Sequence, residues 1–268
     1  MTQLRKHVRH VALAYPVTSP WMARFLQGVA DYAARQGGWN ISTSPPTLSG
    51  AEEFAMNIHS LRGWSGDGVI AAVRNQQEAR VARRIGVPVV NLAGTSEKTG
   101  LPRVMVDHRS IGRIAAEHLL ERGFRRLAYC GTEGLYYSRQ RMLGFMEEAK
   151  RAGVPCEVLE MRHVIDSRAS WQQRHHPLDR WLEKLRHPVG LLAIHDYRAR
   201  VVMDECRRLG LDVPHDVAVM GVDNDTTVCE FCQPTLSSVS RNARRVGYEG
   251  PRFWIASWRA RRRPKTTL

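Results

Sequence analysis

No apolar run in this sequence is long enough to cross a membrane. A membrane helix needs roughly 18 to 20 successive apolar residues, and no stretch of the 268-residue chain reaches that length. The basic start is followed by a short apolar run that contains Pro16 and no small-residue cleavage site, so it does not fit a secretory signal peptide. We therefore expect a cytoplasmic protein.

The sequence also has few of the motifs from which enzymes and metal sites are built. Its five cysteines are scattered and odd in number, which is typical of a reducing compartment. Cys229 and Cys232 form a single Cys-x-x-Cys pair, whereas a structural zinc site needs four ligands. There is no phosphate-binding loop, no Gly-x-Ser-x-Gly motif and no glycine-rich dinucleotide motif. We expect no enzyme, no metal and no cofactor.

Acidic residues are scarce relative to basic ones. The 26 Asp and Glu residues face 40 Lys and Arg residues, and the net charge is +14. Such a charge favours an anionic partner such as nucleic acid. Part of the excess lies in residues 251–268, which contain no acid, and an arginine-rich coding background explains the rest. With no helix-turn-helix pattern before His10 or after Tyr248, we expect no sequence-specific DNA binding by this chain alone.

The stretch Gly190–Asp225 predicts a strand, a helix and a second strand. An apolar run over residues 190–195 precedes Asp196, a candidate helix N-cap. A second apolar run, Val217–Val222, leads into Asp223. A unit of this length joins parallel strands through a right-handed crossover. Ligands bind at the carboxyl ends of such strands, so polar residues at these ends are candidates for a binding site.

Strand and helix patterns alternate along the rest of the chain, which predicts an α/β fold with parallel sheets and helices on both faces. Strands are expected at residues 10–15, 40–43, 68–73, 88–93, 127–131 and 155–161. Helices are expected at residues 20–35, where Ser19 is a candidate cap, and at 51–61, 76–85, 110–122 and 138–152, with one ending near 186 and another starting at 242.

Several of these segments resemble a known family. Gly66–Ile70, Ser138–Arg141 with Gly144-Phe145, the stretch 190–225 and Cys229–Glu249 are similar to the LacI/GalR-type effector domains, which share the fold of periplasmic sugar-binding proteins. The resemblance covers residues 8–249. It implies two lobes, three chain crossings between them, and a sugar bound between the lobes. We expect an N-terminal lobe of residues 1–104 and 237–268 and a C-terminal lobe of residues 105–236.

The chain opens almost directly on the strand at His10–Tyr15, with no helix-turn-helix before it. This order resembles the xylose operon regulators, in which the sugar-binding domain comes first and an AraC-type DNA-binding domain follows. The resemblance implies a homodimeric sensor of D-xylose or a similar neutral sugar, which would reach DNA only through a domain missing from this chain. The alternative is a solute-binding protein of a sugar transporter, which would need export.

Candidate ligand residues follow successive strands. A neutral sugar needs carboxylate and amide acceptors, a planar arginine donor and an aromatic surface. The candidates are Trp21, Asp107, Arg141, Asp196, Asp223 and Asn224. By resemblance, Arg141 occupies the effector-contacting arginine of the Ser-x-x-Arg-x-x-Gly-Phe pattern, and Asp223 the aspartate after the Val-x-Gly-x strand.

Each candidate also has a structural alternative. Trp21 could pack in the core, Asp107 and Asp196 could only cap helices, and Asp223 could only turn the chain. His195 stands with Asp196 where many sugar repressors have an Asn-Asp pair, which leaves its role open.

The tail, Gly250–Leu268, does not look like the end of this fold. Phe253, Trp254 and Trp258 lie among arginines without an acid to balance them, although Trp254 and Trp258 could share a helix face. In the family, the chain continues here with small and apolar residues and then an acidic, proline-containing loop. If Gly250–Leu268 is translated back into one choice of GC-rich codons and read two bases further on, a sequence of that kind results. We expect a frameshift near Glu249, with a basic nucleic-acid tail as the alternative.

Overall fold

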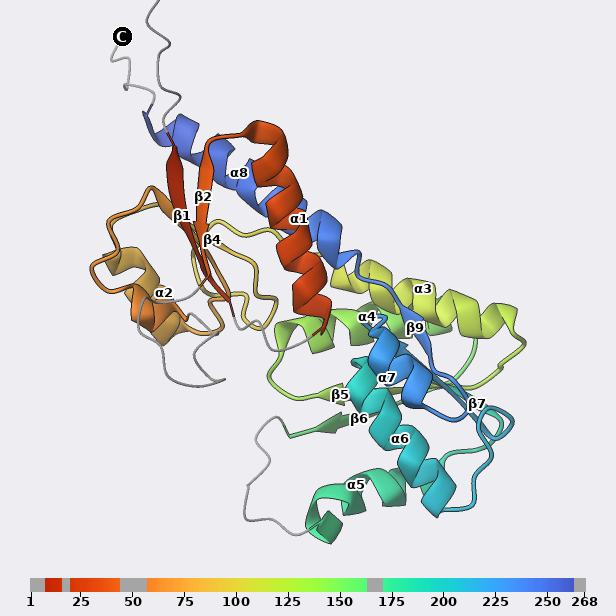
Figure 1. Ribbon diagram of the computed structural model, residues 1–268. Helices are drawn as coiled ribbons and strands as arrows, with labels where there is room; N and C mark the ends of the chain where they lie inside the picture. Colours follow the sequence, from red (N-terminus) through yellow and green to blue (C-terminus); the bar gives the residue numbers. More distant parts are fainter. Residues whose placement is uncertain (1–7, 16–19, 44–56, 163–170, 263–268) are drawn as a thin grey trace, which may run out of the picture. The chain divides into compact units, whose positions relative to one another are not determined.

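Parallel strands joined by helices build two α/β units. A computed structural model describes residues 8–15, 20–43, 57–162 and 171–262. Unit 1 comprises Met1–Val106 and Asn242–Leu268, and unit 2 comprises Asp107–Arg241 (Figure 1). The predicted α/β class, with parallel sheets and helices on both faces, is confirmed.

In its described residues, unit 1 contains a four-stranded parallel sheet in the order β2-β1-β3-β4. Its elements are β1 (Arg9–Ala14), α1 (Pro20–Gln36), β2 (Trp39–Ser42), the 3₁₀ helix η2 (Ile58–Leu61), β3 (Gly68–Ala71), α2 (Gln76–Arg84), β4 (Val89–Asn91) and α8 (Ala243–Arg262). One face of the sheet packs against η2 and α2, and the other packs against α1 and α8.

Across its described residues, unit 2 has a five-stranded parallel sheet in the order β6-β5-β7-β8-β9. Its elements are α3 (His108–Glu121), β5 (Leu127–Thr132), α4 (Tyr136–Arg151), β6 (Cys156–Met161), α5 (Trp171–Lys184), β7 (Val189–Ala193), α6 (Asp196–Arg208), β8 (Val217–Val222), α7 (Thr226–Phe231) and β9 (Ser237–Val239). The stretch predicted as strand, helix and parallel strand is therefore confirmed as β7-α6-β8.

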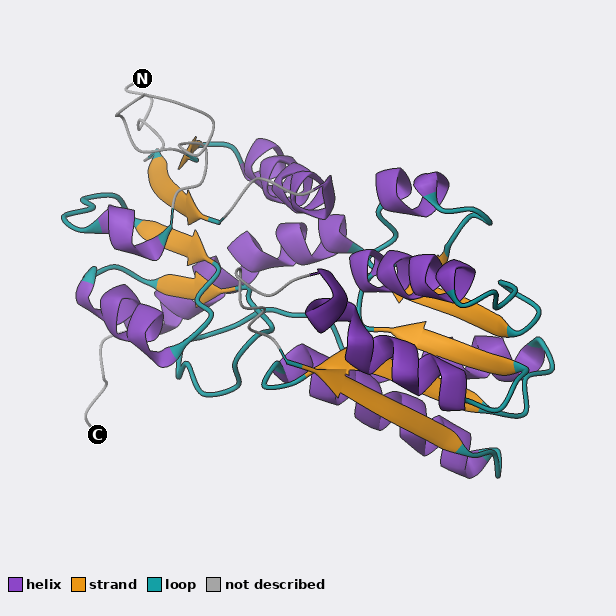
Figure 2. Ribbon diagram, turned by 90° about the horizontal axis from the view of Figure 1, so that it is seen from below, coloured by secondary structure: helices purple, strands orange, loops and turns teal. Residues whose placement is uncertain are grey.

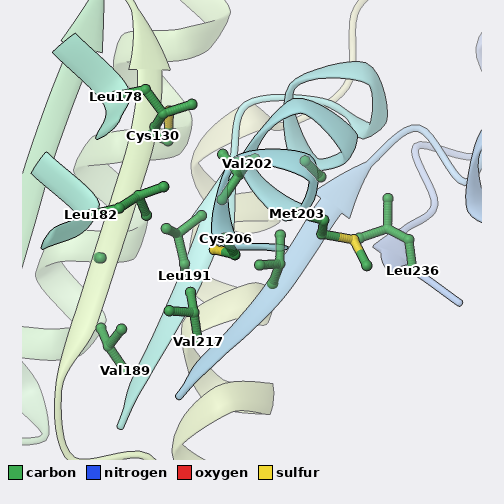
Figure 3. Close-up of a cluster of buried hydrophobic side chains, with 14 of the residues drawn as sticks. Cys130, Leu178, Leu182, Val189, Leu191, Val202, Met203, Cys206, Val217 and Leu236 are labelled. Carbon is green, nitrogen blue, oxygen red and sulfur yellow. The ribbon is translucent and has the colours of Figure 1, made fainter. Parts of the chain in front are cut away.

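Alternation along the strands sends side chains to both faces of the unit 2 sheet. On one face, buried side chains of α5 and α6 meet those of β5, β7 and β8 (Figure 3). They include Leu178, Leu182, Val202, Met203, Cys206, Cys130, Leu191 and Val217. On the other face, the Tyr129 ring of β5 lies 6.2 Å from the Phe145 ring of α4. Burial on both faces explains why these strands read as continuous apolar runs.

Helices α1 and α8 of unit 1 lie side by side and touch backbone to backbone (Figure 1). A Cβ atom on Gly28 would lie 1.9 Å from the Arg244 carbonyl oxygen, and one on Gly247 would lie 2.0 Å from the Phe25 carbonyl oxygen. Arg244 Nε also donates to Asp31 Oδ2 at 2.7 Å. Only glycine permits so close a crossing, because any Cβ would overlap the facing carbonyl.

Helices α3 and α4 of unit 2 repeat the same crossing. A Cβ atom on Gly112 would lie 2.0 Å from the Arg141 carbonyl oxygen, and one on Gly144 would lie 2.0 Å from the Arg109 carbonyl oxygen. Arg109 Nε donates to Glu147 at 2.8 Å. In both pairs, each glycine faces the carbonyl three residues before the other glycine, so the two units share one packing solution.

The structure differs from the predicted lobe boundaries. Residues 237–241 were assigned to the N-terminal lobe, but β9 pairs with β8 and belongs to unit 2. The chain passes between the units at 106/107 and at 241/242. The short helix α7 is not among the helices expected from the sequence, and Asp225 caps it through the Thr227 N–H.

Two further segments differ from the prediction in local structure. Asn57 caps η2, so the described end of the helix predicted over 51–61 is a single 3₁₀ turn; residues 51–56 and the predicted cap Ser19 lie outside the described residues. The predicted α6 cap, Asp196, is instead the first helical residue, and His195 caps the helix by accepting the Arg198 N–H at 3.0 Å.

The tail fits the fold better than the sequence indicated. Helix α8 runs on through Gly250, and Trp254 is fully buried in the core of unit 1. Its ring lies 5.6 Å from the Trp39 ring, and its Nε1 donates to the Pro88 carbonyl at 3.1 Å. A Cβ on Gly68 would lie 2.3 Å from Trp254, so β3 leaves room for this indole. The expectation that the tail does not suit the fold is therefore wrong for the described residues up to Ala256.

No helix in the described part of the chain combines the length and apolar character needed to cross a bilayer.

The helix crossing predicts unequal effects for two glycines of α8. Gly247→Ala should lower the free energy of unfolding by about 1–3 kcal/mol, because its methyl group would force α1 and α8 apart. Gly250→Ala places its methyl 3.4 Å from a Leu92 methyl and should change it by less than about 1 kcal/mol, because the gain in helix propensity is opposed by crowding against the ring of Pro251. Urea unfolding measures both, and equal effects would contradict the crossing.

Candidate functional site

The strand order of unit 2 creates a switch point between β5 and β7. The chain moves from β5 outward to β6 and then returns to β7 on the other side of β5. The loops after β5 and β7 therefore diverge, and ligands bind in the crevice at such a point outside the carboxyl ends of the strands. Figure 2 shows the strands of this sheet pointing the same way, so their carboxyl ends lie along one edge. Arg141 and His195 follow β5 and β7.

Arg141 reaches from α4 to the end of β7. Its side chain is 1% exposed, and Nη1 donates to the carbonyl oxygen of Ile194. Among the described residues, its buried Nε and Nη2 have no hydrogen-bond partner. The Tyr137 ring lies 5.2 Å from Cζ. Burial, followed by the charge of Arg241, lowers the pKa of Arg141 to about 10. The guanidinium is therefore a buried cation with incomplete compensation.

Asp223 ends β8 in a strained turn. Asp223 and Asn224 have φ values of 120° and 51°, which non-glycine residues rarely adopt. The Asp223 carboxylate forms an ion pair with Arg241, with 2.5 Å between Oδ1 and Nε. Burial raises the pKa of Asp223, and the charge of Arg241 opposes that shift. Strain of this kind persists where the surroundings fix the backbone, often at binding sites.

Asp196 is committed to internal hydrogen bonds. Its side chain has no exposure. Oδ2 accepts the Asp225 N–H at 2.8 Å and faces Cys229 Sγ at 3.7 Å, and Oδ1 accepts the Ser238 hydroxyl at 2.5 Å. A Cβ on Gly221 would lie 2.2 Å from Oδ1. Burial is the main reason that the pKa of Asp196 rises to about 6. We infer that this carboxylate organises the site and does not contact ligand.

Two neutral histidines border Arg141. His108 is 5% exposed, and its ring lies 5.8 Å from the Tyr137 ring. Burial, followed by the charges of Arg141 and Arg241, lowers the pKa of His108 to about 3. Burial and then Arg198 and Arg141 lower the pKa of His195 to about 4. Because His195 Nδ1 accepts the Arg198 N–H, its proton is on Nε2.

The structure brings together some of the sequence candidates but not all of them. Arg141 and Asp223 act on each other electrostatically in unit 2. The Asn224 N–H donates to Ser238 Oγ at 2.9 Å in the same turn. Asp107 caps α3, accepting the Ser110 N–H at 3.0 Å and its hydroxyl at 2.7 Å, which lowers the pKa of Asp107. Trp21 lies in the first turn of α1, and its side chain lies outside the described residues.

Four side chains of this cluster escaped the sequence reasoning: His108, Tyr137, Arg198 and Arg241. Tyr137 stands one helical turn before Arg141, a spacing that brings side chains together and could have been noticed. Arg241 follows β9, a three-residue strand that the sequence did not predict.

Cys229 and Cys232 are buried free thiols whose pKa burial raises, which makes them weak nucleophiles. No cluster of three metal-ligating side chains occurs within the described ranges.

Over residues 116–267, more than half of its length, the chain matches the family model described as the periplasmic binding protein-like domain. The match continues through the tail beyond Glu249.

Among curated proteins, the chain is similar to the xylose operon regulatory protein of Escherichia coli (strain K12). The two are 28% identical over 257 residues, which cover 91% of this chain and 62% of that protein. The protein of the same name from Haemophilus influenzae is 23% identical over 251 residues, with the same coverage. The chain thus spans about three-fifths of the length of these relatives.

Among solved structures, the fold is similar to that of a xylose-binding transcription activator, with a TM-score of 0.76 and 24% identity over 98% of this chain and 67% of that one. It is also similar to the transcriptional regulator CelR in complex with cellobiose, with a TM-score of 0.70 and 23% identity over 96% and 80% of the two chains. At these identities the likeness establishes the fold.

The pKa of His108 predicts a loss of stability in acid. Between about pH 3 and pH 6.5, His108 is neutral in the folded protein and takes up a proton when the chain unfolds. Its contribution to stability is therefore lost as the pH falls below about 6.5, and the loss levels off below about pH 3. Between these limits the free energy of unfolding should fall by about 1.4 kcal/mol per pH unit for this one group. Asp196, whose pKa is raised, contributes the opposite slope between its folded value near 6 and its ordinary value.

Denaturant unfolding of the wild type and His108→Gln between pH 7 and pH 4 separates the two groups. The variant should lose the His108 slope and keep those of Asp196 and of His195, whose pKa is also lowered, and an unchanged slope would show that His108 does not titrate in this way.

Proposed function

Because the chain belongs to the periplasmic binding protein-like domain family, we propose that it is the effector-sensing domain of a sugar-responsive transcriptional regulator. The observation that carries this proposal is Arg141, a buried guanidinium at the β5/β7 switch point with two N–H-bearing nitrogens unpaired in the described structure. Internal packing gains nothing from such a group, whereas a ligand with oxygen acceptors would compensate it.

Within this site each side chain has a distinct task. Arg141 would donate to ligand oxygens, and Asp223 would accept from ligand hydroxyls while Arg241 holds its carboxylate in place. Tyr137 would offer an apolar ring face. Trp21 and Asn224 remain ligand candidates, whereas Asp107 and Asp196 support the helix and turn on which the site is built.

D-xylose is the first effector to test, because the similar curated proteins are named xylose operon regulatory proteins. Those proteins extend beyond the matched region, so we propose that DNA contact requires an additional DNA-binding domain, of the AraC type. A regulator of this kind acts in the cytoplasm, where its DNA is. A transport solute-binding role is not favoured, since the similar curated proteins are regulators.

We also propose that the chain forms a homodimer through the outer face of α6 and α7. Phe231, at the end of α7, is 75% exposed. It borders a hollow of about 220 Å³ lined by Arg200, Met203, Asp204, Arg207, Cys232 and Gln233. A large apolar side chain beside a polar hollow is typical of a protein contact, where aromatic residues are enriched.

Effector binding predicts a thermal shift that depends on Arg141 and Asp223. Millimolar D-xylose should raise the melting temperature of the wild type, because a ligand that binds only the folded state stabilises it. Arg141→Ala and Asp223→Ala should each remove charged hydrogen bonds worth about 1.5–3 kcal/mol and abolish the shift. Circular dichroism would verify that both variants fold.

Arg113→Ala is the matched control for this experiment, because Arg113 is a half-exposed arginine in α3 that pairs with Glu117. It should keep the full shift. Wild-type affinity in either site variant would remove that residue from the site, and a screen of pentoses and hexoses without any shift would reject sugar sensing.

The dimer proposal predicts that Phe231→Asp dissociates the protein into monomers, because a buried unpaired charge opposes association. Sedimentation equilibrium measures the effect. Phe253→Asp is the control, since Phe253 is 42% exposed on α8 of unit 1 and should leave the dimer intact. A monomeric wild type would contradict the proposal, and dissociation by the control alone would move the contact to unit 1.

A further inference from the structure

The unpaired edge of Arg141 has the geometry of a carboxylate receptor. Nη1 is already bound to the Ile194 carbonyl, and the two nitrogens without partners in the described chain are Nε and Nη2. These nitrogens present parallel N–H groups from one edge of the planar guanidinium. Two parallel donors match the two oxygens of a carboxylate in a bidentate pair.

Three arginines extend along the carboxyl edge of the unit 2 sheet. Arg198 Nη1 donates to Met161 Sδ at the end of β6 at 3.0 Å, Arg141 reaches the end of β7, and Arg241 reaches Asp223 at the end of β8. Of these contacts, only that of Arg241 is with a carboxylate. The partners of the other two are a thioether and a carbonyl, neither of which carries a charge.

The other acidic side chains nearby are turned toward internal donors. Both oxygens of Asp196 accept hydrogen bonds from its own unit, and Asp225 Oδ1 accepts the Thr227 N–H as the cap of α7. Asp223 is paired with Arg241 and acts on Arg141 only as a charge at a distance, so the described ion pairs leave Arg141 and Arg198 without a carboxylate partner.

The remaining polar groups add donors to this edge. His195 accepts with Nδ1 and so offers Nε2–H, and burial together with the nearby arginines lowers its pKa to about 4, which keeps it neutral. Helix α4 begins without a side-chain cap, whereas α3, α6 and α7 each have one. Uncapped N–H groups at a helix start favour an anion. Arg141 lies in the second turn of this helix.

We propose that the effector carries a carboxylate that docks on the Nε–Nη2 edge of Arg141, so that the ligand class is a monosaccharide acid. The proposal rests on the proposed function, since it takes unit 2 to be a sugar site, and it specifies the charge of the sugar. Arg198 supplies a second positive charge and thereby sets the preference for an acid over the neutral sugar.

The test compares D-glucuronate with D-xylose, whose pyranose rings carry the same hydroxyl configuration and differ in the carboxylate that glucuronate bears on C5. Titration calorimetry on the whole chain at neutral pH should show D-glucuronate binding at least about tenfold more tightly, as expected for a charge-assisted bidentate pair. Its affinity should fall as salt is raised, whereas that of D-xylose should not change. Equal or tighter binding of D-xylose would overturn the inference and leave sugar sensing intact.

Arg198→Gln tests the electrostatic part without altering the buried Arg141. It should weaken binding of D-glucuronate several-fold more than that of D-xylose, whereas Arg113→Gln should affect neither. An equal loss for both ligands would overturn the role of Arg198 in selectivity. Tighter binding of a pentose phosphate than of any sugar acid would overturn the carboxylate, and failure of every neutral and acidic monosaccharide would reject the proposed function as well.

Discussion

A carboxylate without solvent exposure holds the ligand edge of unit 2 together. The Asp196 carboxylate accepts hydrogen bonds from the backbone N–H of Asp225, after β8, and from the hydroxyl of Ser238 in β9. Gly221 has no side chain and so leaves room for this carboxylate. Taking a carboxylate out of water is costly, and the cost is visible in its raised pKa. Its internal donors offset that cost, and in doing so they fix the strained turn at Asp223 and the point at which Arg241 leaves β9.

Arg141, which binds the carbonyl of Ile194 two residues before Asp196, presents the opposite case. It is as deeply buried as Asp196, yet internal groups satisfy only one of its three nitrogens among the described residues. The cost of burying one charge is therefore largely offset within the fold, and the other charge leaves its interaction energy available for an external partner. Both side chains lie at the carboxyl edge of the unit 2 sheet. Asp196 therefore makes rigid the same edge at which Arg141 is placed to bind ligand.

The sequence predicted the strands and helices well because both faces of each sheet are buried, which produces long apolar runs between polar loops. It also predicted Arg141 and Asp223 as site residues, which only ligand binding will test. It did not separate Asp196 from them, because burial and hydrogen-bond partners are tertiary properties. Arg241 was missed because β9 has three residues, and Trp254 was misread because Gly68, which makes room for it, is distant in sequence.

The reciprocal glycine crossing makes positions of the two units structurally equivalent. If Gly28 corresponds to Gly144 and Gly247 to Gly112, then Arg244 and Asp31 correspond to Arg109 and Glu147, and both pairs form an ion pair. The two units therefore share one helix-packing geometry, including the ion pair beside the glycines. The counterpart of Arg141 is then Phe25, which stacks on Tyr15 at 5.0 Å. The same position of the shared geometry thus holds a cation in unit 2 and an aromatic ring in unit 1.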